Sequence, residues 1–123
     1  MQQIIDGLHL KQTDFEVPVI LFTKGAGLKI SDMADTDCDA LGIDWTMTLS
    51  QARNLTNNKL ALQGNLNPHI LTKSEAEIEQ AVADVLADYG SSPGHVFNLG
   101  HGITPDIDPA KVKLLVNTVH ELS

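Results

Sequence analysis

Residues 94–102 read Gly-His-Val-Phe-Asn-Leu-Gly-His-Gly, a short apolar run that carries the chain to a histidine between two glycines. Glycine has no Cβ, so the backbone can turn sharply at Gly100 and Gly102 and come close to a bound molecule. The pattern predicts that the His101 ring lies at the end of a strand with open access. An imidazole changes its charge nearest neutral pH of all side chains, which suits His101 to proton transfer. A tight turn with an incidental histidine explains this stretch equally well.

The rest of the chain alternates between strand-like and helix-like segments. Short apolar runs bounded by Gly, Asn or Asp are typical of buried strands, and they occupy residues 17–22, 39–44, 59–63 and 95–99. The spacing of apolar residues predicts helices over residues 2–10, 28–35, 49–57 and 75–89, and a last helix that begins at Pro109. Ser74 with Glu77 forms a capping-box pattern, and Asp108 stands where a helix cap is expected.

This alternation predicts an α/β fold with a parallel sheet and right-handed crossovers. Four βα units form either an open doubly wound sheet or part of a (β/α)₈ barrel, and a complete barrel typically needs about 250 residues. The chain has 123 residues, which is enough for one domain with a real core but not for a complete barrel.

Each predicted strand runs into a polar or glycine-containing tripeptide. These are Thr23-Lys24-Gly25, Asp44-Trp45-Thr46, Gly64-Asn65-Leu66 and Gly100-His101-Gly102. In parallel α/β folds the carboxyl ends of the strands share one face, where ligands bind. The usual polarity of βα loops explains any one tripeptide better than a site does, but all four together favour a binding site.

The composition fits a folded globular chain and excludes several functions. Hydrophobic residues make up 42% and charged residues 20% of the sequence. The net charge of −8 argues against nucleic-acid partners, and Arg53 is the only arginine that could hold a substrate carboxylate. No apolar run approaches the roughly 20 residues that span a membrane, and no secretory signal is visible. The single cysteine, Cys38, cannot form an internal disulfide, so we expect a cytoplasmic protein.

Four blocks of the sequence resemble the C-terminal part of the uroporphyrinogen decarboxylase family. They are LFTKGAG (21–27), GIDW (42–45), ALQGNLNP (61–68) and GHVFNLGHGITPDIDP (94–109), and the similarity runs from Met1 to Ser123. The resemblance implies a (β/α)₈ TIM barrel of which residues 1–123 supply the second half, as a single partial domain of four βα units. Met1 would then fall inside a helix that begins further upstream in the full enzyme.

The resemblance also implies an activity. The family converts uroporphyrinogen to coproporphyrinogen in haem biosynthesis by removing carbon dioxide from acetate side chains, with neither a metal nor an organic cofactor. A protonated pyrrole ring can accept the electrons that the departing carboxylate leaves behind, so the enzyme must supply a proton and stabilise a cationic ring.

Only one of the family's active-site residues carries over, namely the histidine of the NLGHG motif, His101. The resemblance gives His101 a catalytic and substrate-binding role. The family's catalytic aspartate, arginines and tyrosine belong to the N-terminal half, and neither Tyr89 nor Arg53 corresponds to them. We therefore expect no decarboxylase activity from this chain alone. The chain departs from the family at Asn67, where an aspartate is usual, and a turn-capping role survives that change.

Other polar residues have structural explanations. No spacing of histidines fits a metal site, so no metal is expected. Gly25-Ala26-Gly27 is a weak phosphate-loop signal. Lys24 and Asp44 could face a substrate, core packing is preferred for Trp45, and Asn65 and Asn98 are expected to hold loops. His95 is expected to be structural, and His9, His69 and His120 are expected on helices or loops without partners.

A second function class stays open beside the enzyme. A half barrel leaves two sheet edges and an inner face uncovered, which favours association. Two copies could pair into an eight-stranded pseudo-barrel, so the alternative is a non-catalytic assembly module that forms a homodimer.

Overall fold

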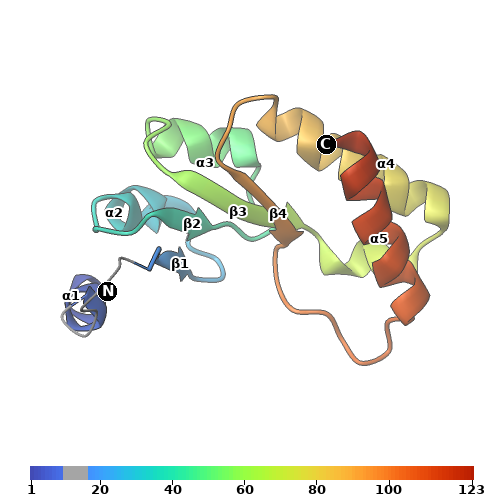
Figure 1. Ribbon diagram of the computed structural model, residues 1–123, viewed down its shortest axis with the longest axis horizontal. Coiled ribbons are helices and arrows are strands. Elements are labelled where there is room, and N and C mark those ends of the chain that lie inside the picture. The colour runs from blue at the N-terminus through green and yellow to red at the C-terminus, as the bar shows by residue number, and fades with distance from the viewer. Residues whose placement is uncertain (10–16) are drawn as a thin grey trace.

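Four parallel strands of the computed structural model pair side by side in the order of the chain (Figure 1). They are β1 (Ile20–Phe22), β2 (Ala40–Gly42), β3 (Ala61–Leu66) and β4 (His95–Leu99). The structure describes residues 1–9 and 17–123. An open doubly wound sheet reverses its strand order at a switch point, and this sheet does not. The order β1-β2-β3-β4 is that of a barrel segment, as the sequence predicts.

The helices lie between the strands at the predicted places. They are α1 (Gln2–His9), η1 (Gly27–Lys29), α2 (Ile30–Ala34), α3 (Leu49–Leu55), η2 (Pro68–Thr72), α4 (Glu75–Tyr89) and α5 (Pro109–Leu122), where η marks a 3₁₀ helix. The predictions for α4 and β4 match to the residue, and residue 10 of the first predicted helix lies outside the described residues. The segment 28–35 is divided between η1 and α2, and the predicted third strand, 59–63, ends three residues too early.

Local side-chain bonds explain where the helices begin. Thr48 and Gln51 form a reciprocal capping box at α3, and Ser74 and Glu77 form the predicted one at α4. Asp108 accepts a hydrogen bond from the Ala110 N–H at 2.8 Å, ahead of the first turn of α5. These caps satisfy N–H groups that have no partner inside the helix.

In the part of the chain that the structure describes, the core lies mainly on one face of the sheet. Leu21, Leu41 and Leu62 are in register on the face that carries the helices, and Leu41 and Leu62 are fully buried. The neighbouring row contains Phe22 and Val96, whose side chains are 47% and 46% exposed. In Figure 1, α2, α3 and α4 lie along the same side of the sheet. The opposite face is the one that would line the inside of a barrel.

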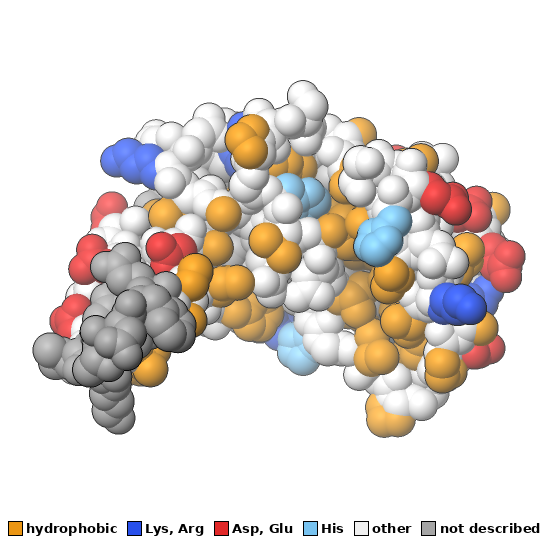
Figure 2. All heavy atoms as spheres, viewed as in Figure 1, with side chains coloured by type: hydrophobic (Ala, Val, Ile, Leu, Met, Phe, Trp, Pro, Cys, Tyr) orange, Lys and Arg blue, Asp and Glu red, His pale blue; other side chains and the backbone are white. Residues whose placement is uncertain are grey.

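Exposed apolar side chains accompany this one-sided packing. On the visible face the charged side chains lie mainly toward the two ends of the molecule, with hydrophobic ones between them (Figure 2). Ile20 on β1 is 45% exposed, like Phe22 and Val96 on the same bare face of the sheet. Several exposed apolar side chains on one face of a sheet favour an interaction site.

Candidate functional site

The loops that follow β1 and β2 are joined by the carboxylate of Asp44. This side chain is 5% exposed and accepts a hydrogen bond from the Gly25 N–H with one oxygen. Its other oxygen accepts from the N–H and the hydroxyl of Thr46, at 2.9 and 2.5 Å. A buried carboxylate with this many donors is well satisfied, so it fixes both loops against each other.

Asn65 connects the end of β3 to the loop that follows β2. Its side-chain amide donates hydrogen bonds to the backbone oxygens of Asp44 and Met47, at 3.0 and 2.5 Å. The residue is 8% exposed. The prediction that Asn65 holds a loop by side-chain to backbone bonds is therefore confirmed.

The end of β4 lies close to the loop after β2, and the contact is made at Gly100. A Cβ built on Gly100 would lie 2.7 Å from the backbone nitrogen of Trp45 and 3.0 Å from its Cε3 atom. Only a residue without a side chain lets the end of β4 sit this near the loop after β2. At Gly102, by contrast, an added Cβ would meet nothing within 4 Å. Of the two glycines beside His101, Gly100 is the one that the packing requires.

The His101 side chain is exposed at the carboxyl ends of the strands, and it lies between two aromatic rings. Its ring centroid lies 6.2 Å from that of Trp45 and 6.5 Å from that of Phe22, both in edge-on arrangements. Its Nδ1 accepts a hydrogen bond from the Gly102 N–H at 2.8 Å. A neutral imidazole that accepts at Nδ1 carries its hydrogen on Nε2, so the free side of the ring is a donor. This contact leaves Nε2 as the ring nitrogen that can meet a ligand at the carboxyl ends of the strands.

Burial and the surrounding donors and charges shift the pKa of Asp44 in opposite directions. Burial alone would raise its pKa, but the hydrogen bonds from Thr46 and Gly25 and the positive charge of Lys24 together outweigh that effect. The pKa of Asp44 is held below its usual value, so the carboxylate is charged at neutral pH. A charged Asp44 is what the N–H donors of both loops require.

A cavity of about 380 Å³ opens beside His101. Trp45 forms one wall, and the ammonium Nζ of Lys24 lies 5.4 Å from the centroid of the Trp45 ring. His69 and Asp106 also line it, and the pKa of Asp106 is lowered by the Thr104 side chain and, more weakly, by the charge of His69. The cavity therefore combines an aromatic wall with several cationic or titratable groups.

The structure revises two sequence-based assignments in this cavity. Trp45 is half-buried and lines the cavity, so the preference for core packing is wrong. His69, which had no expected partner, lies beside Asp106 and faces the same cavity as His101. Phe22 was missed altogether. Its signal was its place as the last residue of β1, opposite Gly42, whose missing side chain leaves room for the ring.

Other candidate residues have structural roles. Asn67 caps η2 by accepting from the His69 N–H at 3.1 Å, and Asn98 accepts from the Leu99 N–H at 2.8 Å. His95 stacks on Tyr89 with ring centroids 4.5 Å apart. The Gly25 N–H is bound to Asp44, which removes it as a phosphate donor.

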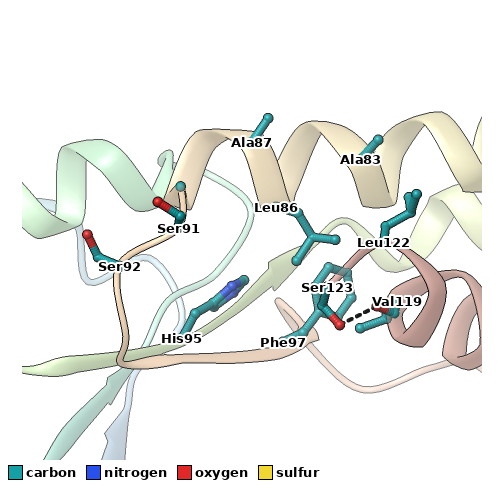
Figure 3. A pocket seen from close by; sticks show the side chains of 11 residues that line it. Ala83, Leu86, Ala87, Ser91, Ser92, His95, Phe97, Val119, Leu122 and Ser123 are labelled. Atoms are coloured by element: carbon teal, nitrogen blue, oxygen red, sulfur yellow. Dashed lines mark hydrogen bonds between the residues drawn. The ribbon is translucent and has the colours of Figure 1, made fainter.

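A larger cavity, of about 860 Å³, lies away from this site between α4, α5 and β4 (Figure 3). Leu86, Phe97 and Leu122 give it an apolar lining. His95 is its one ionisable side chain among the lining residues, and its Nε2 is 2.8 Å from the Gly64 carbonyl oxygen. With that ring already bonded and stacked, the cavity offers little chemistry, and the smaller one beside His101 is the candidate site.

The part of the chain that the structure describes contains neither a metal-binding cluster nor a membrane-spanning helix. In residues 1–9 and 17–123, no three His, Cys, Asp or Glu side chains converge in a way that could hold a metal ion. Within the same residues, no helix has both the length and the apolar character needed to cross a membrane.

Parallel strands in chain order, helices on one face and polar groups at the carboxyl ends define part of a (β/α)₈ barrel with its ligand face. Residues 1–122 match the family model described as uroporphyrinogen decarboxylase (URO-D), and the chain belongs to that family. It is 51% identical to a uroporphyrinogen decarboxylase of Alcanivorax borkumensis and 50% identical to those of Histophilus somni and Pseudomonas syringae pv. tomato. Each match covers all of this chain and 35% of the relative's length.

A solved structure supports the fold. A methyltransferase from Methanosarcina mazei superimposes with a TM-score of 0.73 at 22% sequence identity. The match covers 86% of this chain and 32% of the methyltransferase. The expected barrel-type α/β arrangement of four parallel strands is therefore confirmed, and the chain spans about a third of the relatives it matches.

The contact at Gly100 can be tested with a matched pair of variants. Gly100→Ala is expected to push Trp45 away and to lower the free energy of unfolding by about 1–3 kcal/mol, the usual cost of overpacking. Gly102→Ala, where an added methyl meets nothing, serves as the control. Urea unfolding followed by Trp45 fluorescence measures both; equal stability of the two variants would contradict the close approach.

The hydrogen bonds of Asp44 predict a pH-dependent loss of stability. Asp44→Asn is expected to cost about 2 kcal/mol at pH 7, because one loop donor is left without an acceptor. The folded-state pKa lies below the ordinary value of 3.8, so this stabilisation is present above that pH and is lost as the pH falls through the folded-state pKa. Urea midpoints of the two proteins should therefore converge in acid.

The exposed Asp32 on α2 provides the control. Asp32→Asn is expected to change the free energy of unfolding by less than about 0.5 kcal/mol. A difference between wild type and Asp44→Asn that stays constant down to strongly acidic pH would show that the carboxylate charge does not hold the loops.

Proposed function

We propose that this chain forms part of the active site of a uroporphyrinogen decarboxylase, in which His101 contacts the tetrapyrrole substrate. The observation that carries the proposal is the position of the His101 ring at the carboxyl ends of the strands, with Nδ1 bound to Gly102 and Nε2–H free. The names of the relatives, which the chain matches over its full length, support the same reaction.

The proposed chemistry needs one proton donor and a place for a cationic ring. A proton enters the pyrrole ring, the bond between the acetate methylene and its carboxylate breaks, and the electron pair flows into the ring. Carbon dioxide leaves, a proton adds to the exocyclic methylene, and the proton first added to the ring is released, so an acetate becomes a methyl group with a net uptake of one proton. The neutral His101 ring can donate its Nε2–H to a substrate carboxylate, and the ring supplies a proton only after it has taken one up at Nδ1, which releases the Gly102 N–H. The rings of Phe22 and Trp45 form an apolar boundary beside it. The proposal uses neither a metal ion nor an organic cofactor.

The four strands are proposed to be the last four of the barrel. The remaining two thirds of the relatives' length would supply the other strands, the carboxylate and the arginines that the reaction requires. On this proposal residues 1–123 alone carry no decarboxylase activity. A cytoplasmic location is proposed with it, since Cys38 is buried and unpaired.

A second candidate function is self-association without catalysis. The bare face of the sheet carries Ile20, Phe22 and Val96, each nearly half exposed. Within residues 1–9 and 17–123, β1 and β4 each pair with a strand on one side only. When the remaining strands of a barrel are absent, a second copy of the chain is the partner that this face and these edges fit.

The role of His101 can be measured in a chimera that carries this chain in place of the matching third of the Alcanivorax borkumensis relative. The chimera is expected to decarboxylate enzymatically generated uroporphyrinogen under anaerobic conditions, and the isolated chain is not. His101→Gln keeps an N–H donor but cannot exchange protons at neutral pH, so it should lower kcat by about 100-fold or more. Chromatography of the oxidised porphyrins gives the rates.

His120→Gln, on the exposed surface of α5, is the matched control and should leave the rate unchanged. A His101→Gln chimera with normal kcat and a raised KM would assign His101 to binding alone. Normal kcat and normal KM together would remove it from the site, and activity of the isolated chain would show that the essential groups lie within residues 1–123.

Self-association has its own measurement. Light scattering of the isolated chain is expected to give a dimer of the 13.3 kDa protomer. Val96→Asp on the bare face should return it to a monomer, because burying an unpaired charge is costly. Val116→Asp, at an equally exposed position on α5, should not. A wild-type monomer without exposed apolar surface would exclude the dimer.

A further inference from the structure

The site must bind anions although the chain as a whole repels them. The net charge is −8, and a substrate ringed by carboxylates would be disfavoured by that charge over a distance of about 8–10 Å. Arg53, the only arginine, donates to the Tyr89 carbonyl oxygen at 2.6 Å and to the Asn58 side chain at 2.9 Å. That arginine is therefore engaged between α3 and the end of α4. A local cation at the strand ends has to come from another residue.

Lys24 is the permanently charged cation that lines the cavity beside His101. It is the second residue after the end of β1, and its Nζ lies 5.4 Å from the centroid of the Trp45 ring. The face of an indole attracts an ammonium group, so Trp45 restricts where the long side chain rests. Because the Trp45 ring also lies 6.2 Å from the His101 ring, the ammonium and the imidazole border the same space.

Asp44 holds Lys24 and Trp45 together without neutralising the ammonium by direct contact. Its hydrogen bonds go to Gly25 and Thr46, the residues that follow Lys24 and Trp45 in the chain. Both carboxylate oxygens are thus occupied by loop donors, and Lys24 acts on Asp44 only through its charge. The three N–H donors of the ammonium stay available for an anion that enters the cavity.

We propose that Lys24 and Trp45 form a carboxylate-binding subsite next to His101, and that Asp44 is the residue that positions it. The inference rests on the proposed function, since the carboxylate would be one of those on a pyrrole ring of the substrate. Lys24 pairs with the carboxylate while the Trp45 ring packs against the apolar part of the same side chain. His101 then faces a neighbouring carboxylate or the ring itself.

The probe for the test is porphobilinogen, a single pyrrole with one acetate and one propionate side chain. The full chain contains one tryptophan, so the indole N–H signal in a proton–nitrogen NMR spectrum reports on Trp45 alone. Titration is expected to shift this signal in a saturable way. Lys24→Met should weaken the affinity up to about fivefold, the upper end of the range for solvent-exposed ion pairs, and Lys24→Arg should retain it.

Lys29→Met is the control, because it removes an exposed lysine from η1, the 3₁₀ helix after Lys24. Its affinity for porphobilinogen is expected to equal that of the wild type. Asp44→Asn should lose as much affinity as Lys24→Met, although the lysine is still present, while the signals of α4 and α5 stay in place. A merely structural effect of Asp44 would move those helix signals as well.

The outcomes separate the subsite from the function on which it rests. No saturable shift in the wild type, or equal affinities of wild type and Lys24→Met, would overturn the subsite. Weaker binding in His101→Gln with unchanged binding in Lys24→Met would support the role of His101 and reject that of Lys24. The reverse pattern would establish the subsite and remove His101 from substrate binding.

Discussion

The buried carboxylate of Asp44 is the interaction on which the arrangement of the strand ends depends. It collects the donors of two loops, while Asn65 fastens the backbone of the same segment to β3. Once this segment is fixed, Trp45 is fixed with it, and Gly100 allows β4 to approach Trp45 closely. The loops after the four strands, which are far apart in the sequence, are thereby held together by contacts with the segment that follows β2. The position of His101 is a result of this set more than of its own flanking residues.

The second constraint is the one-sided cover of the sheet. Helices bury Leu41 and Leu62 completely, whereas Phe22 and Val96 in the next row keep nearly half of their surface exposed. Burial of apolar area is the main favourable contribution to folding, so a face of this kind gains free energy when something covers it. The same residues that would line a barrel therefore make association favourable.

The sequence predicted the order and type of the elements better than their ends or the shape of the site. Strong helical periodicity and caps gave α4 correctly, because the information lies within the segment itself. The third strand was predicted too short, because Gly64 and Asn65 look like loop residues although they continue the ladder with β4. The half-buried Trp45, the role of Gly100 and the place of His69 depend on contacts between distant loops. Such contacts leave no local pattern, so only the folded structure shows them.

The agreement between strand order and chain order has a consequence for how the protein is made. Each strand pairs with the strand synthesised just before it, so during translation a new βα unit always meets a finished neighbour. Contacts between segments that are close in sequence also carry a small loop-closure cost. The chain can therefore fold progressively as it leaves the ribosome, with the most recently completed strand as the growing edge at each stage. Of the two open edges in the described part of the sheet, the one at β1 is completed first and the one at β4 last.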